Sequence, residues 1–134
     1  YSMKLQIESR VLGDLVINHI LPAAKRYQTV LLQNVQGVKQ VFSTSEAEKL
    51  SEQDILLIRS IENHTSAITA KVNNMNKERA RANHIDNQRE RAITFHDYVV
   101  PLMEEIRQHV DALEMVIDDQ LWPLPKYREL LFIH

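Results

Sequence analysis

Hydrophobic residues recur at intervals of three and four along most of this chain. That spacing places them on one side of an α-helix, so the pattern predicts helices rather than strands. We expect three long helices, over residues 5–42, over residues 46–84, and from a turn within residues 83–88 to about Leu121. The third helix has the clearest apolar stripe, which consists of Phe95, Val99, Leu102, Ile106, Val110, Leu113 and Ile117.

The first two helices are expected to bury similar stripes. The first stripe consists of Leu5, Leu12, Val16, Ile20, Ala23, Tyr27, Leu31, Val35, Val38 and Val41. The second consists of Leu50, Leu57, Ile58, Ile61, Thr65, Ile68, Val72 and Met75. From Lys77 to Asn83 the sequence is polar nearly all round, so this end of the second helix should be exposed.

Prolines interrupt the first and third helices, at Pro22 and Pro101. A proline inside a helix removes a backbone donor and clashes with the carbonyl group four residues earlier, at a cost of ~3 kcal/mol. Because the apolar stripe keeps its phase on both sides of each proline, we predict kinks near these residues rather than breaks. Gly13 and Gly37 each cost about 1 kcal/mol relative to alanine, so each is expected where another backbone comes close.

Capping residues indicate where the second and third helices begin. Ser45 and Glu48 have the spacing of a capping box, in which the serine hydroxyl and the glutamate side chain each satisfy a free amide at the helix start. Asp86 is the candidate N-cap of the third helix. With only 2 glycines and 4 prolines in the chain, the connections must be few and short. Three long helices joined in this way run antiparallel.

The last residues form a tail that is apolar at its end. Pro123 and Pro125 stop the third helix, and Pro125 fits the first position of a short fourth helix. We therefore predict an all-α antiparallel bundle of three long helices plus a short C-terminal helix that packs back on the bundle. Residues expected to dock the tail or to contact another subunit are Trp122, Pro123, Tyr127, Leu130, Leu131 and Phe132. The aromatic residues of this set either form a recognition surface or simply cap the core, and the sequence leaves both interpretations open.

Composition and charge restrict the possible partners. The formal net charge of -2 gives no overall attraction to nucleic acid or to an anionic membrane. No apolar stretch approaches the ~20 residues that span a bilayer. The chain contains no cysteine, which excludes disulfides and thiolate sites and is compatible with the cytoplasm. A length of 134 residues fits a single domain, and the abrupt helical start suggests a piece of a longer protein.

The sequence contains no recognisable catalytic, cofactor-binding or metal site. Di-metal bundles need a Glu-x-x-His pair on two helices, and no histidine here has a glutamate three residues before it. Glu105 and His109 share a helix face, but one such pair is more typical of a polar surface contact. No P-loop or dinucleotide fingerprint is present. The basic cluster between Lys77 and Arg91 is interrupted by acidic residues and contains no aromatic residue, so we expect a solvated hairpin tip.

Several segments resemble the type III glutamine synthetases. The tail at residues 118–133, with the sequence Asp-Asp-Gln-Leu-Trp-Pro-Leu-Pro-Lys-Tyr-Arg-Glu-Leu-Leu-Phe-Ile, is similar to the extreme C-terminus of that family. Residues 8–15 and the Asn-His-Ile-Leu-Pro-Ala-Ala motif at residues 18–24, followed by Tyr27 and Gln28, resemble the helix that leaves the catalytic domain. Asn34-Val35, Glu90-Arg91-Ala92 and Val100-Pro101-Leu102-Met103 also fit.

The resemblance implies that residues 1–134 are the helical C-terminal domain of a larger enzyme. That enzyme would join ammonia to glutamate, with ATP and magnesium or manganese, and would assemble into rings. Its β-grasp and catalytic domains would lie upstream, so this domain would have no catalytic residue and would contact the rest of its own chain and neighbouring subunits. The alternative is a stand-alone helical adaptor that binds a partner helix or peptide through an apolar groove. A metal-binding or RNA-binding bundle is disfavoured by the missing ligand pairs and the mixed charge.

Overall fold

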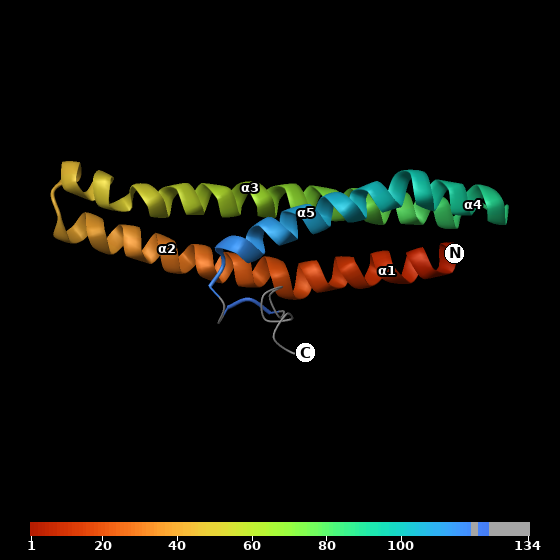
Figure 1. The fold of residues 1–134 in the computed structure, drawn as a ribbon, viewed down its shortest axis with the longest axis horizontal. Coiled ribbons are helices and arrows are strands. Elements are labelled where there is room, and N and C mark those ends of the chain that lie inside the picture. The colour runs from red at the N-terminus through yellow and green to blue at the C-terminus, as the bar shows by residue number, and fades with distance from the viewer. Residues whose placement is uncertain (119–120, 124–134) are drawn as a thin grey trace.

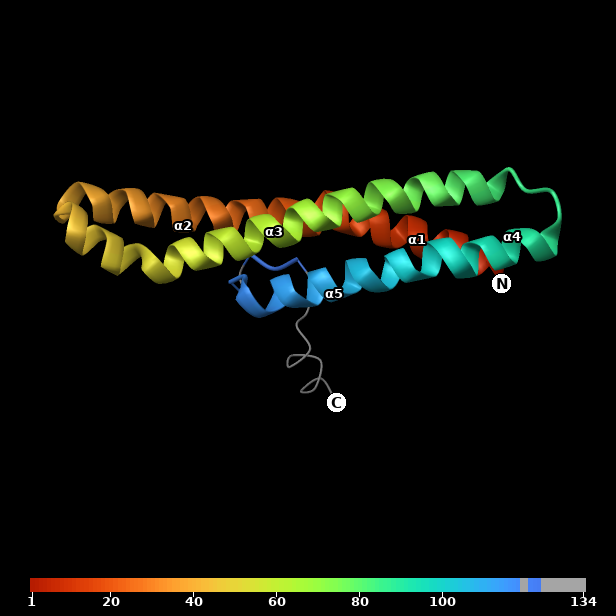
Figure 2. The same ribbon diagram turned by 90° about the horizontal axis from the view of Figure 1, so that it is seen from above.

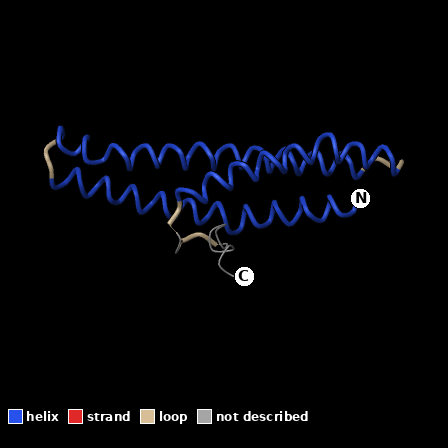
Figure 3. Tube along the Cα trace, in the orientation of Figure 1, coloured by secondary structure: helices blue, strands red, loops and turns tan. Residues whose placement is uncertain are grey.

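The computed structural model describes residues 1–118 and 121–123 and shows an elongated bundle of helices (Figure 1). In chain order the elements are α1 (Ser2–Leu15), η1 (Val16–Ile20), α2 (Leu21–Val41), α3 (Thr44–Asn83), α4 (Gln88–Thr94), η2 (Phe95–Val99) and α5 (Val100–Val116). No strand occurs in the described part of the chain, and loops are confined to short turns (Figure 3). The predicted all-α class, with three helical segments that pack together, is confirmed.

Helix α3 is the element on which the others pack. It contains 40 residues, which corresponds to a length of about 60 Å at ~1.5 Å per residue. Its most extensive contacts are with α2 and with α5. Figure 2 shows that α5 ends part of the way along α3, so α2 and α3 extend past it as a hairpin. We call this hairpin, residues 30–57, the α2–α3 arm.

The buried residues of the hydrophobic core come mainly from η1, α2, α3, η2 and α5, and α1 contributes only partly buried side chains. The largest buried side chains of the core include Val16, Ile20, Ile61, Ile68, Val72, Met75, Phe95, Val99, Ile106, Leu113 and Ile117. All of these belong to the predicted stripes. Two predicted core residues are exposed instead, because both lie on the α2–α3 arm beyond the end of α5: Val41 is 76% exposed and Leu50 is 55% exposed.

Each proline inside a helix follows a π-helical turn. The Leu21 N–H donates to the Val16 carbonyl oxygen, and the Val100 N–H donates to the Phe95 carbonyl oxygen. Such bonds join residues five apart and widen the helix locally, which relieves the crowding that a proline creates in a straight α-helix. The helical path therefore continues through Pro22 and Pro101 without a break, while the predicted kinks stay a prediction.

The structure corrects both predicted N-caps. The second helix begins two residues earlier than the Ser45–Glu48 box implies, because the Ser43 hydroxyl accepts the Glu46 N–H at 3.3 Å. At the third helix, Asn87 replaces Asp86 as the cap, since its Oδ1 atom accepts the Glu90 N–H at 3.0 Å.

The third helix also ends earlier than Leu121. Helix α5 stops at Val116, and Ile117 has an extended backbone. Acidic residues such as Asp118 oppose the dipole at a helix C-terminus, which favours an end before them. The predicted short C-terminal helix lies outside the described residues.

Candidate interaction surfaces

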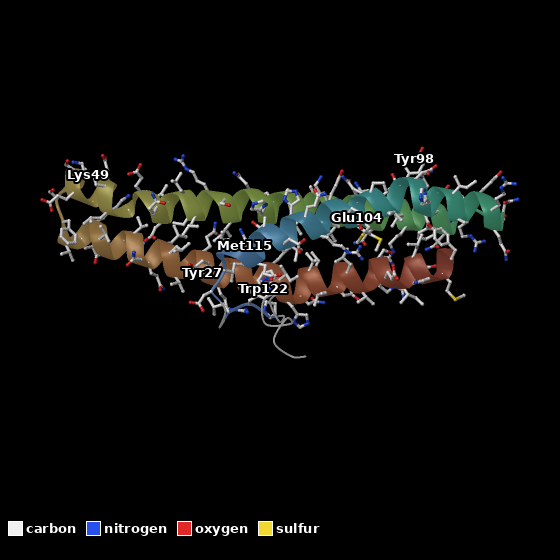
Figure 4. All side chains as sticks on the ribbon, in the orientation of Figure 1. Tyr27, Lys49, Tyr98, Glu104, Met115 and Trp122 are labelled. Atoms are coloured by element: carbon white, nitrogen blue, oxygen red, sulfur yellow. The ribbon has the colours of Figure 1, made fainter. Side chains whose placement is uncertain are left out.

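Of the residues in the predicted tail surface, the structure describes Trp122 and Pro123. Trp122, the aromatic one of the two, is buried. After α5 the chain turns, and the Leu121 and Trp122 N–H groups donate to the Asp118 carbonyl oxygen at 3.0 and 3.1 Å. The Trp122 side chain is 6% exposed and belongs to the core cluster, against which Leu121 and Tyr27 also pack. In Figure 4, Trp122 is labelled next to α1 and α2, below the end of α5.

This placement fits a capping role for the indole ring within the bundle. Pro123 is exposed, and Tyr127, Leu130, Leu131 and Phe132 lie outside the described residues. The indole Nε1 atom of Trp122 is buried and has no hydrogen-bond partner among the described residues. Docking of the remaining tail, or its contact with another subunit, stays a prediction.

A polar cluster joins α3 to α5. The Nδ1 atoms of His64 and His109 lie 2.9 Å apart, and their rings meet edge to face. Next to them, Lys71 Nζ donates to Glu105 Oε2 at 2.9 Å. Burial lowers the pKa of His109, the positive potential of His64 and Lys71 lowers it further, and Glu105 acts in the opposite direction. His109 therefore favours its neutral form, in which one ring nitrogen of the pair donates and the other accepts.

The sequence identified Glu105 and His109 as neighbours on one helix face but not their partners on α3. Both side chains turn out to bridge two helices, with Lys71 and His64 respectively. No pattern within a single helix could have shown this, because the partners are 34 and 45 residues away along the chain. The cluster is a packing contact between helices, and no described group of three or more His, Cys, Asp or Glu residues could hold a metal ion.

A second set of polar contacts fixes α2 against α3. Lys25 Nζ donates to Glu62 Oε2 at 2.8 Å, and the Gln28 side-chain amide donates to the same carboxylate at 3.0 Å. The hydrogen bond from Lys25, followed by the one from Gln28, lowers the pKa of Glu62. Farther along the arm, the Asn34 amide donates to Asp54 Oδ2 at 2.6 Å. These contacts set the register of the hairpin but are exposed to solvent, so each adds little to stability.

The basic cluster of the α3–α4 hairpin is largely used within the hairpin itself. Arg91 donates from Nε to the Ile85 carbonyl oxygen and from Nη2 to the Asp86 carbonyl oxygen, which closes the turn between α3 and α4. Arg81 pairs with Glu78 at 2.7 Å, and its guanidinium lies 4.5 Å from the centre of the Tyr98 ring. The sequence missed this aromatic partner, because Tyr98 lies outside the basic segment.

The α2–α3 arm carries an exposed set of large apolar side chains. Its members are Val30, Leu32, Val41, Phe42, Leu50 and Leu56. Gly37 lies among them on α2, and a Cβ atom added there would meet nothing within 4 Å. The prediction that another backbone approaches Gly37 is therefore wrong within the described chain. At Gly13, the other glycine, the neighbours within 4 Å are side-chain atoms of Met75, Val72 and Asn76.

No helix of the described residues is both long and apolar enough to cross a membrane. Because exposed apolar side chains often mark contact sites, the arm is the strongest candidate for an interaction with another protein surface.

Comparisons with known proteins give a consistent family. Residues 1–39 match the family model described as the glutamine synthetase C-terminal domain. A glutamine synthetase of Bacteroides fragilis (strain YCH46) is 52% identical over 132 residues, which cover 98% of this chain and 18% of that protein. A type-3 glutamine synthetase of Dictyostelium discoideum is 26% identical over 143 residues, covering 99% of this chain and again 18% of the relative. The chain thus spans less than a fifth of the length of these relatives.

Proposed function

Since this chain belongs to the family of glutamine synthetase C-terminal domains, we propose that it is a non-catalytic assembly domain of a longer ligase. The ligase would make glutamine from glutamate, ammonia and ATP in the cytoplasm, with magnesium or manganese bound by the upstream part of the polypeptide. The partners of the domain are then the rest of its own chain and the neighbouring subunits of a ring-shaped homo-oligomer.

The observation that carries this proposal is the α2–α3 arm. Most of it extends beyond the end of α5 (Figure 2), and its large apolar side chains Val30, Leu32, Val41, Phe42, Leu50 and Leu56 are exposed. Val41 and Leu50 are more than half exposed although they continue the buried stripes of their helices. Such residues destabilise a solvated surface but stabilise a contact with another subunit. The Asn34–Asp54 hydrogen bond holds the two helices of the arm in register for that contact.

The polar side chains best suited to acid–base chemistry also support a structural role. His64 forms a hydrogen bond with His109, and Lys71 forms one with Glu105. Each of these hydrogen bonds joins α3 to α5. A general acid or base must instead reach a bound substrate. These four side chains link α3 to α5, and we propose that substrate binding and catalysis belong to the upstream polypeptide.

Charge substitutions on the arm of the full-length protein test this proposal. We expect Leu50→Glu combined with Val41→Glu to shift the native oligomer towards smaller species, because the contact would have to bury two charges. Met115→Glu is the matched control, since Met115 is 84% exposed and lies outside the arm. Native mass spectrometry gives the distribution of oligomers, and circular dichroism verifies that the helices are intact. Unchanged oligomers in the double variant would refute a role of the arm in assembly.

A stand-alone adaptor is the second candidate, because the same exposed arm could bind a helix of an unrelated protein. The two functions differ in what precedes Tyr1 in the gene. An assembly domain requires a long upstream coding region in the same reading frame, whereas an adaptor requires an open reading frame of about this length. Sequencing the genomic region around the start of the chain decides between them.

A further inference from the structure

Helix α1 is apolar on two opposite faces. Its inner face contributes Leu5, Leu12 and the adjoining Val16 to the core. Met3, Ile7 and Val11 follow each other at intervals of four and are 73%, 57% and 58% exposed. With ~3.6 residues per turn, these three lie opposite the inner face, where a surface helix is normally polar. In Figure 1, α1 runs along one edge of the bundle, which α2 continues, and α3, α4 and α5 lie to one side of it.

A positively charged hollow adjoins this outer stripe. Arg10 borders both the stripe and a hollow between α1 and α3. The residues that line the hollow are Arg10, Asp14, Asn76, Arg79, Ala80 and Asn83. Arg79 is half-buried, and its Nη1 atom donates to Asn76 Oδ1 at 3.1 Å. Its Nε atom is buried and has no hydrogen-bond partner among the described residues.

The two arginines of the hollow outnumber its one acidic residue, Asp14. Burial lowers the pKa of Arg79, and the neighbouring charge of Arg10 lowers it further, with only partial compensation from Asp14. Within the described chain, neither Arg10 nor Arg79 forms an ion pair with an acidic side chain. A carboxylate that entered the hollow would accept from the Arg79 guanidinium and would offset the excess positive charge of Arg10 and Arg79. Arginine and methionine are also enriched at protein interfaces relative to the rest of the surface.

We propose that the outer face of α1, formed by Met3, Ile7 and Val11 with the Arg10–Arg79 hollow, binds the remainder of the same polypeptide. The bound segment presents apolar residues to the stripe and one Asp or Glu carboxylate to Arg79. This inference rests on the proposed function, because it requires a longer parent chain. More than four-fifths of the length of both relatives lies outside the region they share with this chain, which leaves ample polypeptide for such a contact.

A second copy of this face is a poorer occupant. In a two-fold symmetric contact both sides carry the same patch, in which two arginines outnumber one acidic residue, so the contact would bring an excess of positive charge together. Like charges brought together in this way oppose association. Charge complementarity therefore favours an acidic segment over a second α1.

Photo-crosslinking in the full-length protein tests the occupant directly. A benzoylphenylalanine residue introduced at Ile7 should crosslink to a peptide upstream of Tyr1 and within the same subunit. The matched control is the same residue at Ile17, which is 42% exposed and lies outside the stripe, and it should give no crosslink to that peptide. Assemblies mixed from nitrogen-14 and nitrogen-15 subunits distinguish the origin of the peptide. Crosslinks to another subunit, or no crosslink at all, would overturn the proposal.

The carboxylate contact has its own measurement. In Arg79→Gln, amide hydrogen exchange across residues 3–11 of the full-length protein should accelerate about tenfold, which corresponds to ~1.4 kcal/mol. Asn83→Ala, at the edge of the same hollow, should leave the exchange rate unchanged. Equal rates in Arg79→Gln and the unaltered protein would show that no carboxylate binds there. These outcomes are independent of the arm, because the arm variants change the oligomer while the exchange at α1 reports contact within one subunit.

Discussion

Replacement of Trp122 by alanine tests whether the segment after α5 is part of the folded domain. The side chain is buried in the same cluster as Leu113 and Ile117. Truncation of a buried tryptophan to alanine costs ~3–5 kcal/mol. Since domains of this size are stable by only ~5–15 kcal/mol, that loss is a large fraction of the total. Each kcal/mol lowers the Tm of a domain of this length by ~3–5 °C, so we expect a decrease of at least ~10 °C.

Thermal unfolding of the 134-residue chain, followed by circular dichroism, gives the Tm of both proteins. Trp122 is the only tryptophan, so its fluorescence reports on this site alone. The native emission should be that of a buried indole, and it should shift to longer wavelength in the same transition that removes the helical signal. The reasoning is refuted if the native emission is already that of a solvated indole and Trp122→Ala unfolds at the same temperature as the unaltered chain.

Replacement of Trp122 by phenylalanine separates ring packing from the N–H group. A buried donor without an acceptor costs ~1–3 kcal/mol. Phenylalanine removes that donor, which should stabilise the fold, but its ring is smaller than the indole, which should reduce packing in the cluster. The two changes in free energy therefore oppose each other. We therefore expect Trp122→Phe to lower the free energy of unfolding by less than half as much as Trp122→Ala. Equal losses in the two variants would mean that the indole N–H has an acceptor.

Three further changes test individual contacts by urea unfolding of the same chain. Ser43→Ala should cost ~1 kcal/mol because it removes the cap of α3, whereas Ser45→Ala should change stability by less than ~0.5 kcal/mol; equal losses would restore the cap predicted from the sequence. Gly37→Ala should stabilise the chain by ~0.5–1 kcal/mol, since the added methyl group meets nothing and helix propensity improves; a loss of stability would show that the position is occupied. The pKa of His109 is lowered in the folded state, so the unfolded chain binds more protons: stability should be greatest above pH 6.5 and should fall as the pH decreases below it. His109→Gln should reduce this dependence, and an unchanged pH profile would assign it to other groups.

The spacing of apolar residues predicted the helices well because burial in a bundle follows helical periodicity. Phe95, Val99, Ile106, Leu113 and Ile117 are all buried as predicted. The same pattern could not distinguish the arm from the bundle, since Val41 and Leu50 repeat the stripe in regions that α5 does not reach. Whether a stripe residue is buried depends on whether a neighbouring helix reaches it, and α5 ends at Val116 rather than at Leu121.

The first residue of the second helix could not be predicted from the sequence, because adjacent residues offer more than one N-cap. Ser43, Thr44 and Ser45 are adjacent hydroxyl residues, and Ser43 and Ser45 each precede a glutamate by three positions. Either Ser43 or Ser45 could therefore be the N-cap of a capping box. Which serine caps the helix depends on which helix start allows its apolar residues to pack in the folded bundle. The Ser43 register places Ala47 and Ser51 in buried positions at the start of α3. The candidate interaction residues were still harder to predict, because the Arg10–Arg79 hollow is formed by residues of two different helices. The apolar pattern of one helix does not show which residues of another helix lie next to it.

The exposed apolar residues are concentrated in two parts of the bundle. The core between η1, α3, η2 and α5 is buried, but apolar side chains on the α2–α3 arm and on the outer face of α1 are exposed. Lys49 marks the tip of the arm in Figure 4, and α1 begins towards the opposite end of the molecule. The two proposed contact surfaces are thus separated by much of the ~60 Å length of α3. Because closely packed helices hold both surfaces, the bundle fixes the distance between them. If α1 binds its own polypeptide and the arm binds a neighbouring subunit, the domain acts as a rigid spacer, which requires a well-packed middle and two apolar ends.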